Sequence, residues 1–298
     1  MNKSELLIIV SIAVVLTLSA VIIAVPAQND RSAVYGDLTI LDSDENIVQG
    51  LTLTYKIHDS DGKGYADAKT VVTEVDGNNV KFTNTYKGRW NNETNIELDS
   101  FSKSEAIFDY TDSSEIPEGV TVKKEGDSYR INGGFTEEFG SDYTKYTFKD
   151  LIITLDNTEA VISVSGQITD EYVYTIDEGN YEKFTDVYTY KTNDSVLYAD
   201  WEFEGSSYCD ITKDGFFEES VIYALSMDDY QGATITESSA KLGSLPIEVY
   251  TVNGEVGGVL TEKYEDYKVY VYGKYIISVS GKIDGDEWRA DITVKTDL

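Results

Sequence analysis

The chain has 298 residues, of which 54 are acidic and 24 are basic, and its formal net charge at pH 7 is −30. Such a charge repels nucleic-acid phosphates and anionic lipid head groups, which argues against both as partners. Because Cys209 is the only cysteine, no internal disulfide can form, and stability must come from a buried core.

The first predicted element is an uncharged apolar segment from Leu6 to Val25. A helix of this length extends about 30 Å, which matches the hydrocarbon core of a bilayer. We therefore expect a cytoplasmic N-terminus at residues 1–5, one transmembrane helix at 6–25, a linker at 26–33 and an extracellular remainder. The alternative is a secretory signal that is cleaved near Ala27, which would release the protein.

The remainder contains the same short sequence motifs twice, in the same order, which indicates an internal duplication. We predict two tandem repeats, at residues 34–177 and 178–298. The first repeat contains Thr54-Tyr55-Lys56, Tyr65-Ala66-Asp67, Asn132-Gly133 and Ile162–Gly166. The second contains Thr189-Tyr190-Lys191, Tyr198-Ala199-Asp200, Asn253-Gly254 and Ile277–Gly281.

Both repeats show the alternating or β-branched patterns that are typical of strands. Gly273-Lys274 separates two such runs and predicts a tight hairpin. The dipeptides Asp76-Gly77, Asn132-Gly133, Asn253-Gly254 and Asp284-Gly285 predict further turns. Only short helices are expected, around 102–108 and 215–225. The fold class is therefore all-β, with antiparallel sheets arranged as a sandwich, a barrel or a curved sheet.

A weak metal site is predicted where acidic residues alternate with a glycine. Asp59, Asp61 and Asp67 resemble the oxygen ligands of a calcium loop, but Lys63 and Thr70 occupy positions where ligands are needed. An exposed hairpin turn explains the same residues. No cofactor is expected.

Two other features could serve recognition at a cell surface. Asn92-Glu93-Thr94 and Asn193-Asp194-Ser195 are acceptor patterns for glycosylation at Asn92 and Asn193. The close group Tyr267, Tyr270, Tyr272 and Tyr275 could present rings to a sugar or a protein. Packing of tyrosines across strands explains the group equally directly.

No arrangement of residues in the sequence indicates catalysis. His58 is the only histidine, and neither a nucleophile elbow nor a phosphate-binding glycine loop occurs. We therefore expect a membrane-anchored extracellular β-module that is not an enzyme and binds a surface glycan or protein, or builds the envelope. Two alternatives are a carrier or chaperone for an apolar ligand in a concave sheet, and an envelope-polymer hydrolase that uses paired carboxylates.

Overall fold

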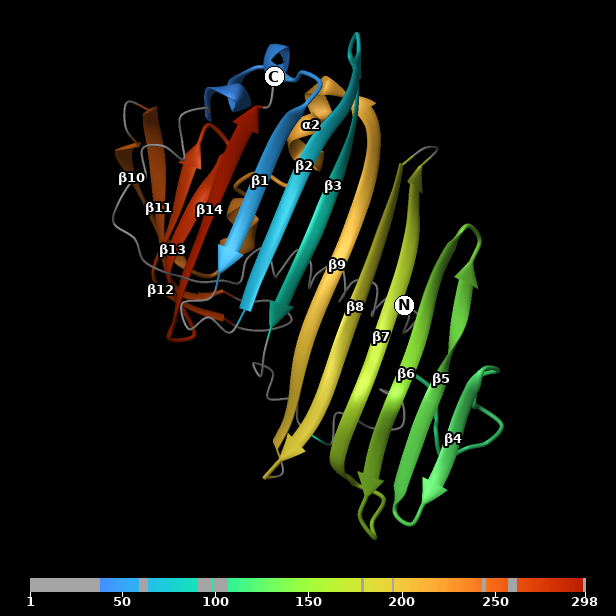
Figure 1. Ribbon diagram of the computed structural model, residues 1–298. Coiled ribbons are helices and arrows are strands. Elements are labelled where there is room, and N and C mark those ends of the chain that lie inside the picture. Colours follow the sequence, from blue (N-terminus) through green and yellow to red (C-terminus); the bar gives the residue numbers. More distant parts are fainter. Residues whose placement is uncertain are drawn as a thin grey trace. The chain divides into compact units, whose positions relative to one another are not determined.

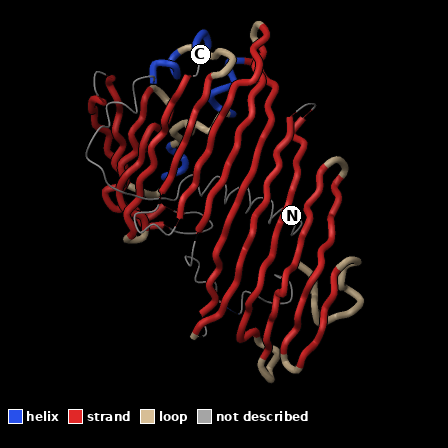
Figure 2. Tube along the Cα trace, viewed as in Figure 1, coloured by secondary structure: helices blue, strands red, loops and turns tan. Residues whose placement is uncertain are grey.

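The computed structural model in Figure 1 describes residues 38–58, 64–90, 98, 107–177, 180–194, 196–242, 245–256 and 262–296. The chain forms two compact units. Unit 1 comprises Met1–Asn84 and Asp210–Leu298, and unit 2 comprises Thr85–Cys209. The predicted all-β class is confirmed, because strands account for most of the described residues (Figure 2). No helix within the described part is long and apolar enough to cross a membrane, and residues 6–25 lie outside that part.

Unit 1 contains an open antiparallel sheet with β10 at its edge. In spatial order its strands are β10 (Thr234–Leu242), β11 (Leu245–Val256), β12 (Glu262–Tyr272), β13 (Tyr275–Ile283), β14 (Asp286–Thr296), β1 (Leu51–His58), β2 (Gly64–Asp76) and β3 (Asn79–Trp90), of which residues 79–84 belong to this unit. Strand β1 pairs with β2 on one side and with β14 on the other. Two 3₁₀ helices, η1 (Leu38–Asp42) and η2 (Asp44–Asn46), precede β1.

A short helical segment covers the apolar face of unit 1. Helix α2 (Lys213–Glu219) buries Phe216 against Phe82 of β3, with ring centroids 4.9 Å apart. It overlaps the range predicted to be helical, 215–225, only at residues 215–219, and it is followed by the 3₁₀ helix η4 (Met227–Tyr230). The range predicted at 102–108 lies almost wholly outside the described residues.

Two buried polar side chains of the sheet form hydrogen bonds with this segment. Thr70 Oγ1 donates to Asn84 Oδ1 at 2.6 Å and accepts the Val221 N–H at 2.9 Å. Asn84 Nδ2 donates to the Glu219 carbonyl at 2.9 Å. Because each of these buried polar groups has a hydrogen-bond partner, its burial does not carry the desolvation cost of an unpaired group. The segment then reaches β13, where Ala224 forms a bridge with Tyr275.

Unit 2 also contains an open antiparallel sheet. Its order is β9 (Val196–Thr212), β8 (Asn180–Asn193), β7 (Val161–Asp177), β6 (Asp142–Leu155), β5 (Ser128–Phe139) and β4 (Val120–Glu125). Alternation places apolar side chains on one face and polar ones on the other. The apolar face packs against Phe108 and Tyr110, which precede β4. Both sheets have free edges, so the barrel among the predicted arrangements does not form in either unit.

In unit 2, the pairing of β5 with β6 and the pairing of β6 with β7 are both irregular, and we call this place a bulged corner. The strand register shifts at Asn132-Gly133 and again around Asp150. Asn132 Oδ1 accepts the Asp150 N–H at 2.9 Å, and Asp150 adopts a φ of 46°. Gly166 on β7 lies against this corner, where a Cβ atom would stand 2.1 Å from the Asp150 carbonyl oxygen.

Unit 1 contains the same corner on β11, β12 and β13. The register shifts at Asn253-Gly254, Asn253 Oδ1 accepts the Asp266 N–H at 2.8 Å, and Asp266 has a φ of 48°. Gly281 on β13 occupies the place against the corner, where a Cβ atom would stand 2.3 Å from the Tyr267 Cα. The corresponding sequence motifs of the two repeats therefore adopt the same local backbone conformation.

These corners correct two of the predicted turns. Asn132-Gly133 and Asn253-Gly254 lie inside strands β5 and β11, so the prediction of chain-reversing turns there was wrong. A bulge and a tight turn both require a positive φ, and glycine supplies it in either case. The turns at Gly273-Lys274, Asp76-Gly77 and Asp284-Gly285 are confirmed as strand connections.

Candidate functional site

Two acidic residues interrupt the apolar face of unit 2. On β7 the inward positions are Ile168, Asp170, Tyr172 and Tyr174, and on β8 they are Phe184, Asp186, Tyr188 and Tyr190. The register places Asp170 directly opposite Asp186. Directly opposed residues of antiparallel strands have Cβ atoms about 5 Å apart, so the two carboxyl groups are neighbours.

The two carboxyl groups differ in their hydrogen bonds. Asp186 is 4% exposed, and its Oδ1 accepts a hydrogen bond of 3.0 Å from the indole Nε1 of Trp201 on β9. Asp170 is partly exposed as a residue, but its Oδ1 atom is buried and has no hydrogen-bond partner among the described residues. Since a buried acceptor without a partner is costly, this oxygen is the chemically unsatisfied atom of the pair.

Burial raises the pKa of both groups. The pKa of Asp170 rises to about 7, first because the group is desolvated and second because Asp186 repels its charge. Desolvation raises the pKa of Asp186 to about 6, and the hydrogen bond from Trp201 opposes this rise. Lys145 and Lys183 on the neighbouring strands alternate onto the opposite face, so neither offsets the charge. Between about pH 6 and pH 7 the pair therefore holds about one proton.

Aromatic rings surround the carboxyl pair. Tyr188 and Trp201 stack with planes 5° apart, and Trp201 stacks on Phe203 at a centroid distance of 4.9 Å. On the other side of the pair, Tyr172 stacks on Phe184 at 5.4 Å. We call this set the aromatic-carboxyl face; its members are Asp170, Tyr172, Tyr174, Phe184, Asp186, Tyr188, Trp201 and Phe203. Tyr174, Tyr188 and Phe203 are partly exposed.

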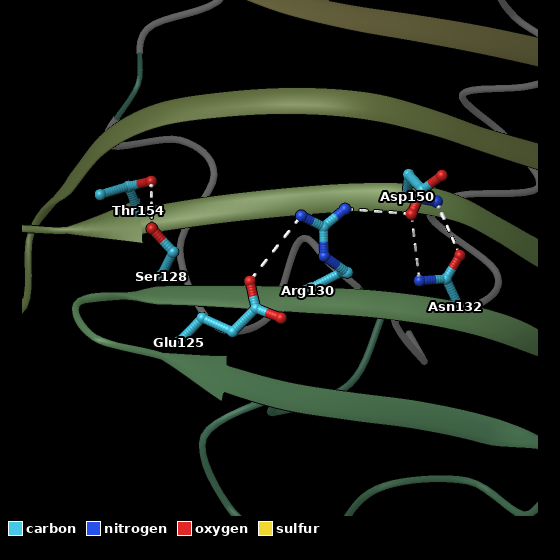
Figure 3. Close-up of polar contacts among 6 residues, drawn as sticks. All are labelled: Glu125, Ser128, Arg130, Asn132, Asp150 and Thr154. Carbon is cyan, nitrogen blue, oxygen red and sulfur yellow. Dashed lines mark hydrogen bonds and ion pairs between the residues drawn. The ribbon is translucent and has the colours of Figure 1, made fainter.

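A second polar cluster lies on the opposite face of unit 2 (Figure 3). Arg130 donates to Asp150 Oδ1 at 3.1 Å and lies 3.8 Å from Glu125. Asn132 completes the cluster through its hydrogen bonds with Asp150. Glu125 and Asp150 are exposed, Arg130 is partly exposed, and the contacts support the bulged corner. The cluster is therefore structural and a weaker candidate than the aromatic-carboxyl face.

The weak metal site predicted from the sequence lies mostly outside the described residues. Asp59 and Asp61 lie outside the described residues, and Asp67 lies on β2 opposite Lys56. No group of three or more His, Cys, Asp or Glu side chains placed to hold a metal ion occurs in the described ranges.

The other predicted recognition residues have separate locations. Asn193 is exposed at the end of β8, and Asn92 lies outside the described residues. Tyr267 and Tyr275 are 2% and 7% exposed, so these two rings pack inside unit 1. They are not available to a ligand in this conformation.

The sequence carried a signal for the aromatic-carboxyl face. An aspartate occupies an inward position in both Ile168–Tyr174 and Phe184–Tyr190, where alternation otherwise places apolar or aromatic residues. An acidic residue at such a position is uncommon unless it is paired or functional.

Comparison with known proteins adds no assignment. No family model, no curated protein and no solved structure matches the chain. The site must therefore be interpreted from its own chemistry.

Proposed function

We propose that this chain is a single-pass membrane-anchored surface protein that binds a glycan on the aromatic-carboxyl face of unit 2. The observation that carries the proposal is the buried Asp170 oxygen without a partner, beside Asp186 and between aromatic rings. A sugar offers hydroxyl donors at its rim and apolar C–H faces above and below, which suit these two kinds of group.

The partly exposed rings would provide the stacking surfaces. Tyr174 lies on β7, the strand that also carries Asp170, and Phe203 lies on β9. Asp186 lies on β8, which is between these two strands. A hydroxyl that donates to Asp170 Oδ1 would remove the cost of its unpaired burial. The whole chain's negative charge favours neutral or amino sugars over acidic ones, because acidic sugars would be repelled.

The carboxyl pair also supports hydrolysis of a glycan as a second candidate function. Glycosidases use one protonated and one ionised carboxyl group, whose environments separate their pKa values. Asp170, with its pKa near 7, would be the acid, and Asp186, with its pKa near 6, would be the base or nucleophile. The binding proposal requires that the glycan is released intact, so the two candidates are distinguishable.

Glycan binding tests the face directly. We expect the full chain in detergent to bind neutral or amino-sugar polymers on an array. Loss of a stacking ring in Tyr174→Ala should weaken affinity by roughly tenfold, the effect of about 1.4 kcal/mol. The matched control is Tyr181→Ala, which removes an exposed tyrosine of β8 from the opposite face.

Three outcomes separate the possibilities. Equal loss of affinity in Tyr174→Ala and Tyr181→Ala, or no binding by the wild type, would contradict the proposed face. Mass spectrometry of the recovered glycan distinguishes binding from cleavage. If the glycan is cut, and if Asp170→Asn stops the cutting but retains binding, hydrolysis replaces binding as the function.

The membrane anchor is a separate part of the proposal. We expect the full chain to stay in the membrane after an alkaline wash, and a protease added to intact cells should digest it. Replacing Val14 and Val15 by arginine should move it to the soluble fraction, because each central arginine costs about 3 kcal/mol. The control replaces the same residues by leucine. Complete protection of the chain in intact cells would contradict the extracellular location.

We also propose that the two repeats, 34–177 and 178–298, arose by duplication. The support is the pair of matching corners, with Asn132, Asp150 and Gly166 in one and Asn253, Asp266 and Gly281 in the other. In this arrangement the opening strands of each repeat join the sheet of the other repeat. Strand β1 joins β14, and β8 joins β7.

A further inference from the structure

Strand β10 is the edge of the unit 1 sheet. It pairs with β11 through Thr234–Leu242, and the order of strands ends there. Seven of its nine residues are exposed. An edge strand presents unpaired backbone N–H and C=O groups along its outer side, and these groups can pair with another strand. β10 contains no proline that would interrupt such pairing.

The sequence of β10 is complementary to itself in one antiparallel register. If two copies pair with Ser239 opposite Ser239, then Glu237 of each copy stands opposite Lys241 of the other. Ser238 then stands opposite Ala240, so only small side chains meet next to the two-fold axis. Opposite charges in directly opposed positions stabilise antiparallel pairs, and the two-fold symmetry provides this charge pair twice. Neither Glu237 nor Lys241 forms an ion pair with another described residue.

The edge strand of unit 2 is shorter and richer in lysine. Strand β4 is six residues long and contains Lys123 and Lys124 in adjacent positions. The antiparallel register that pairs Lys123 with Lys124 of a second copy would bring like charges together twice. Such a register is destabilised, and lysines are a common protection of edge strands. The two edges therefore differ in length and in the number of lysines they carry.

We propose that a second copy of this chain pairs with β10 to form a two-fold symmetric dimer, with the antiparallel register centred on Ser239. The partner is identified by charge complementarity, since Glu237 of each copy stands opposite Lys241 of the other in this register. An edge-to-edge contact buries less surface than a standard interface, so the dimer is weak and depends on concentration. Confinement to one surface would strengthen it.

Disulfide trapping tests the register. In the full chain, Ser239→Cys places two thiols opposite each other across the two-fold axis, and mild oxidation should give a covalent dimer. Thr121→Cys provides the matched control, with one exposed cysteine on the other edge strand. Cys209 is buried and is present in both variants. We expect several-fold more dimer from Ser239→Cys. Equal yields from the two variants would overturn the proposal.

Charge reversal tests the pairing itself. In the Ser239→Cys background, Glu237→Lys or Lys241→Glu alone creates two like-charge pairs, and dimer formation should fall roughly tenfold. The double variant Glu237→Lys, Lys241→Glu restores both pairs with reversed sign and should restore the yield. Circular dichroism checks that each variant is folded. Trapping that does not respond to the single reversals, or that is not restored in the double variant, would exclude this register.

Discussion

A Gly166→Ala variant is expected to lose about 3 kcal/mol or more of its free energy of unfolding. Gly166 has a φ of 111°, which L-residues rarely adopt. Its new Cβ atom would stand 2.1 Å from the Asp150 carbonyl oxygen and 2.6 Å from the Leu151 Cα. These are backbone atoms, so no side chain can rotate away, and β6 and β7 must separate locally.

The control for this variant is Gly126→Ala. Gly126 also has a positive φ, of 66°, but no atom lies within 4 Å of a Cβ built there. The control therefore carries the conformational penalty alone, about 1 kcal/mol. Urea unfolding of both full-length variants measures the difference. Equal losses would show that the close contact with Asp150 contributes nothing beyond the unfavourable φ.

Acidification from pH 8 to pH 5 is expected to stabilise unit 2. The folded-state pKa values of Asp170 and Asp186 rise to about 7 and about 6, from 3.8 for the ordinary side chain. The folded state therefore binds protons more tightly than the unfolded state. The stability that these two carboxyl groups contribute is complete below about pH 4 and is lost as pH rises through 6 and 7. The gain between pH 8 and pH 5 is about 4 kcal/mol for the two groups together.

Asparagine variants isolate this effect from the general relief of negative charge. Asp170→Asn resembles the protonated side chain, so it should be more stable than the wild type at pH 8 and less dependent on pH. Glu138→Gln removes an exposed carboxyl group from β5 and should preserve the wild-type slope. Hydrogen exchange of strands β6 to β8, measured across this pH range, reports on unit 2. A slope that survives in Asp170→Asn and in Asp186→Asn would assign the effect elsewhere.

Local sequence predicted strands well because alternation depends on neighbouring residues only. It predicted the hairpin at Gly273-Lys274, where glycine separates two alternating runs. It failed at Asn132-Gly133, because the distinction between a turn and a bulge depends on the residue across the sheet. Asp150 supplies the N–H that Asn132 accepts, and nothing near Asn132 in the sequence specifies that partner.

The candidate site was missed for a related reason. Asp170 and Asp186 are ordinary acidic residues in a chain that has 54 of them, and only the pairing register brings them together. Their inward position could have been inferred from alternation alone. The hydrogen bond from Trp201 could not, because it depends on the placement of β9 beside β8.

The pairing of β1 with β14 has a consequence for biosynthesis. Leu51 pairs with Thr296, so the first and the last strands of the described chain are neighbours in the sheet of unit 1. Unit 2 is continuous in sequence, whereas the sheet of unit 1 stays incomplete until β14 has been synthesised. Strands β1 and β2 emerge early and must wait for β14. A nascent chain halted before Asp286 would therefore leave one side of β1 without the strand that pairs with it.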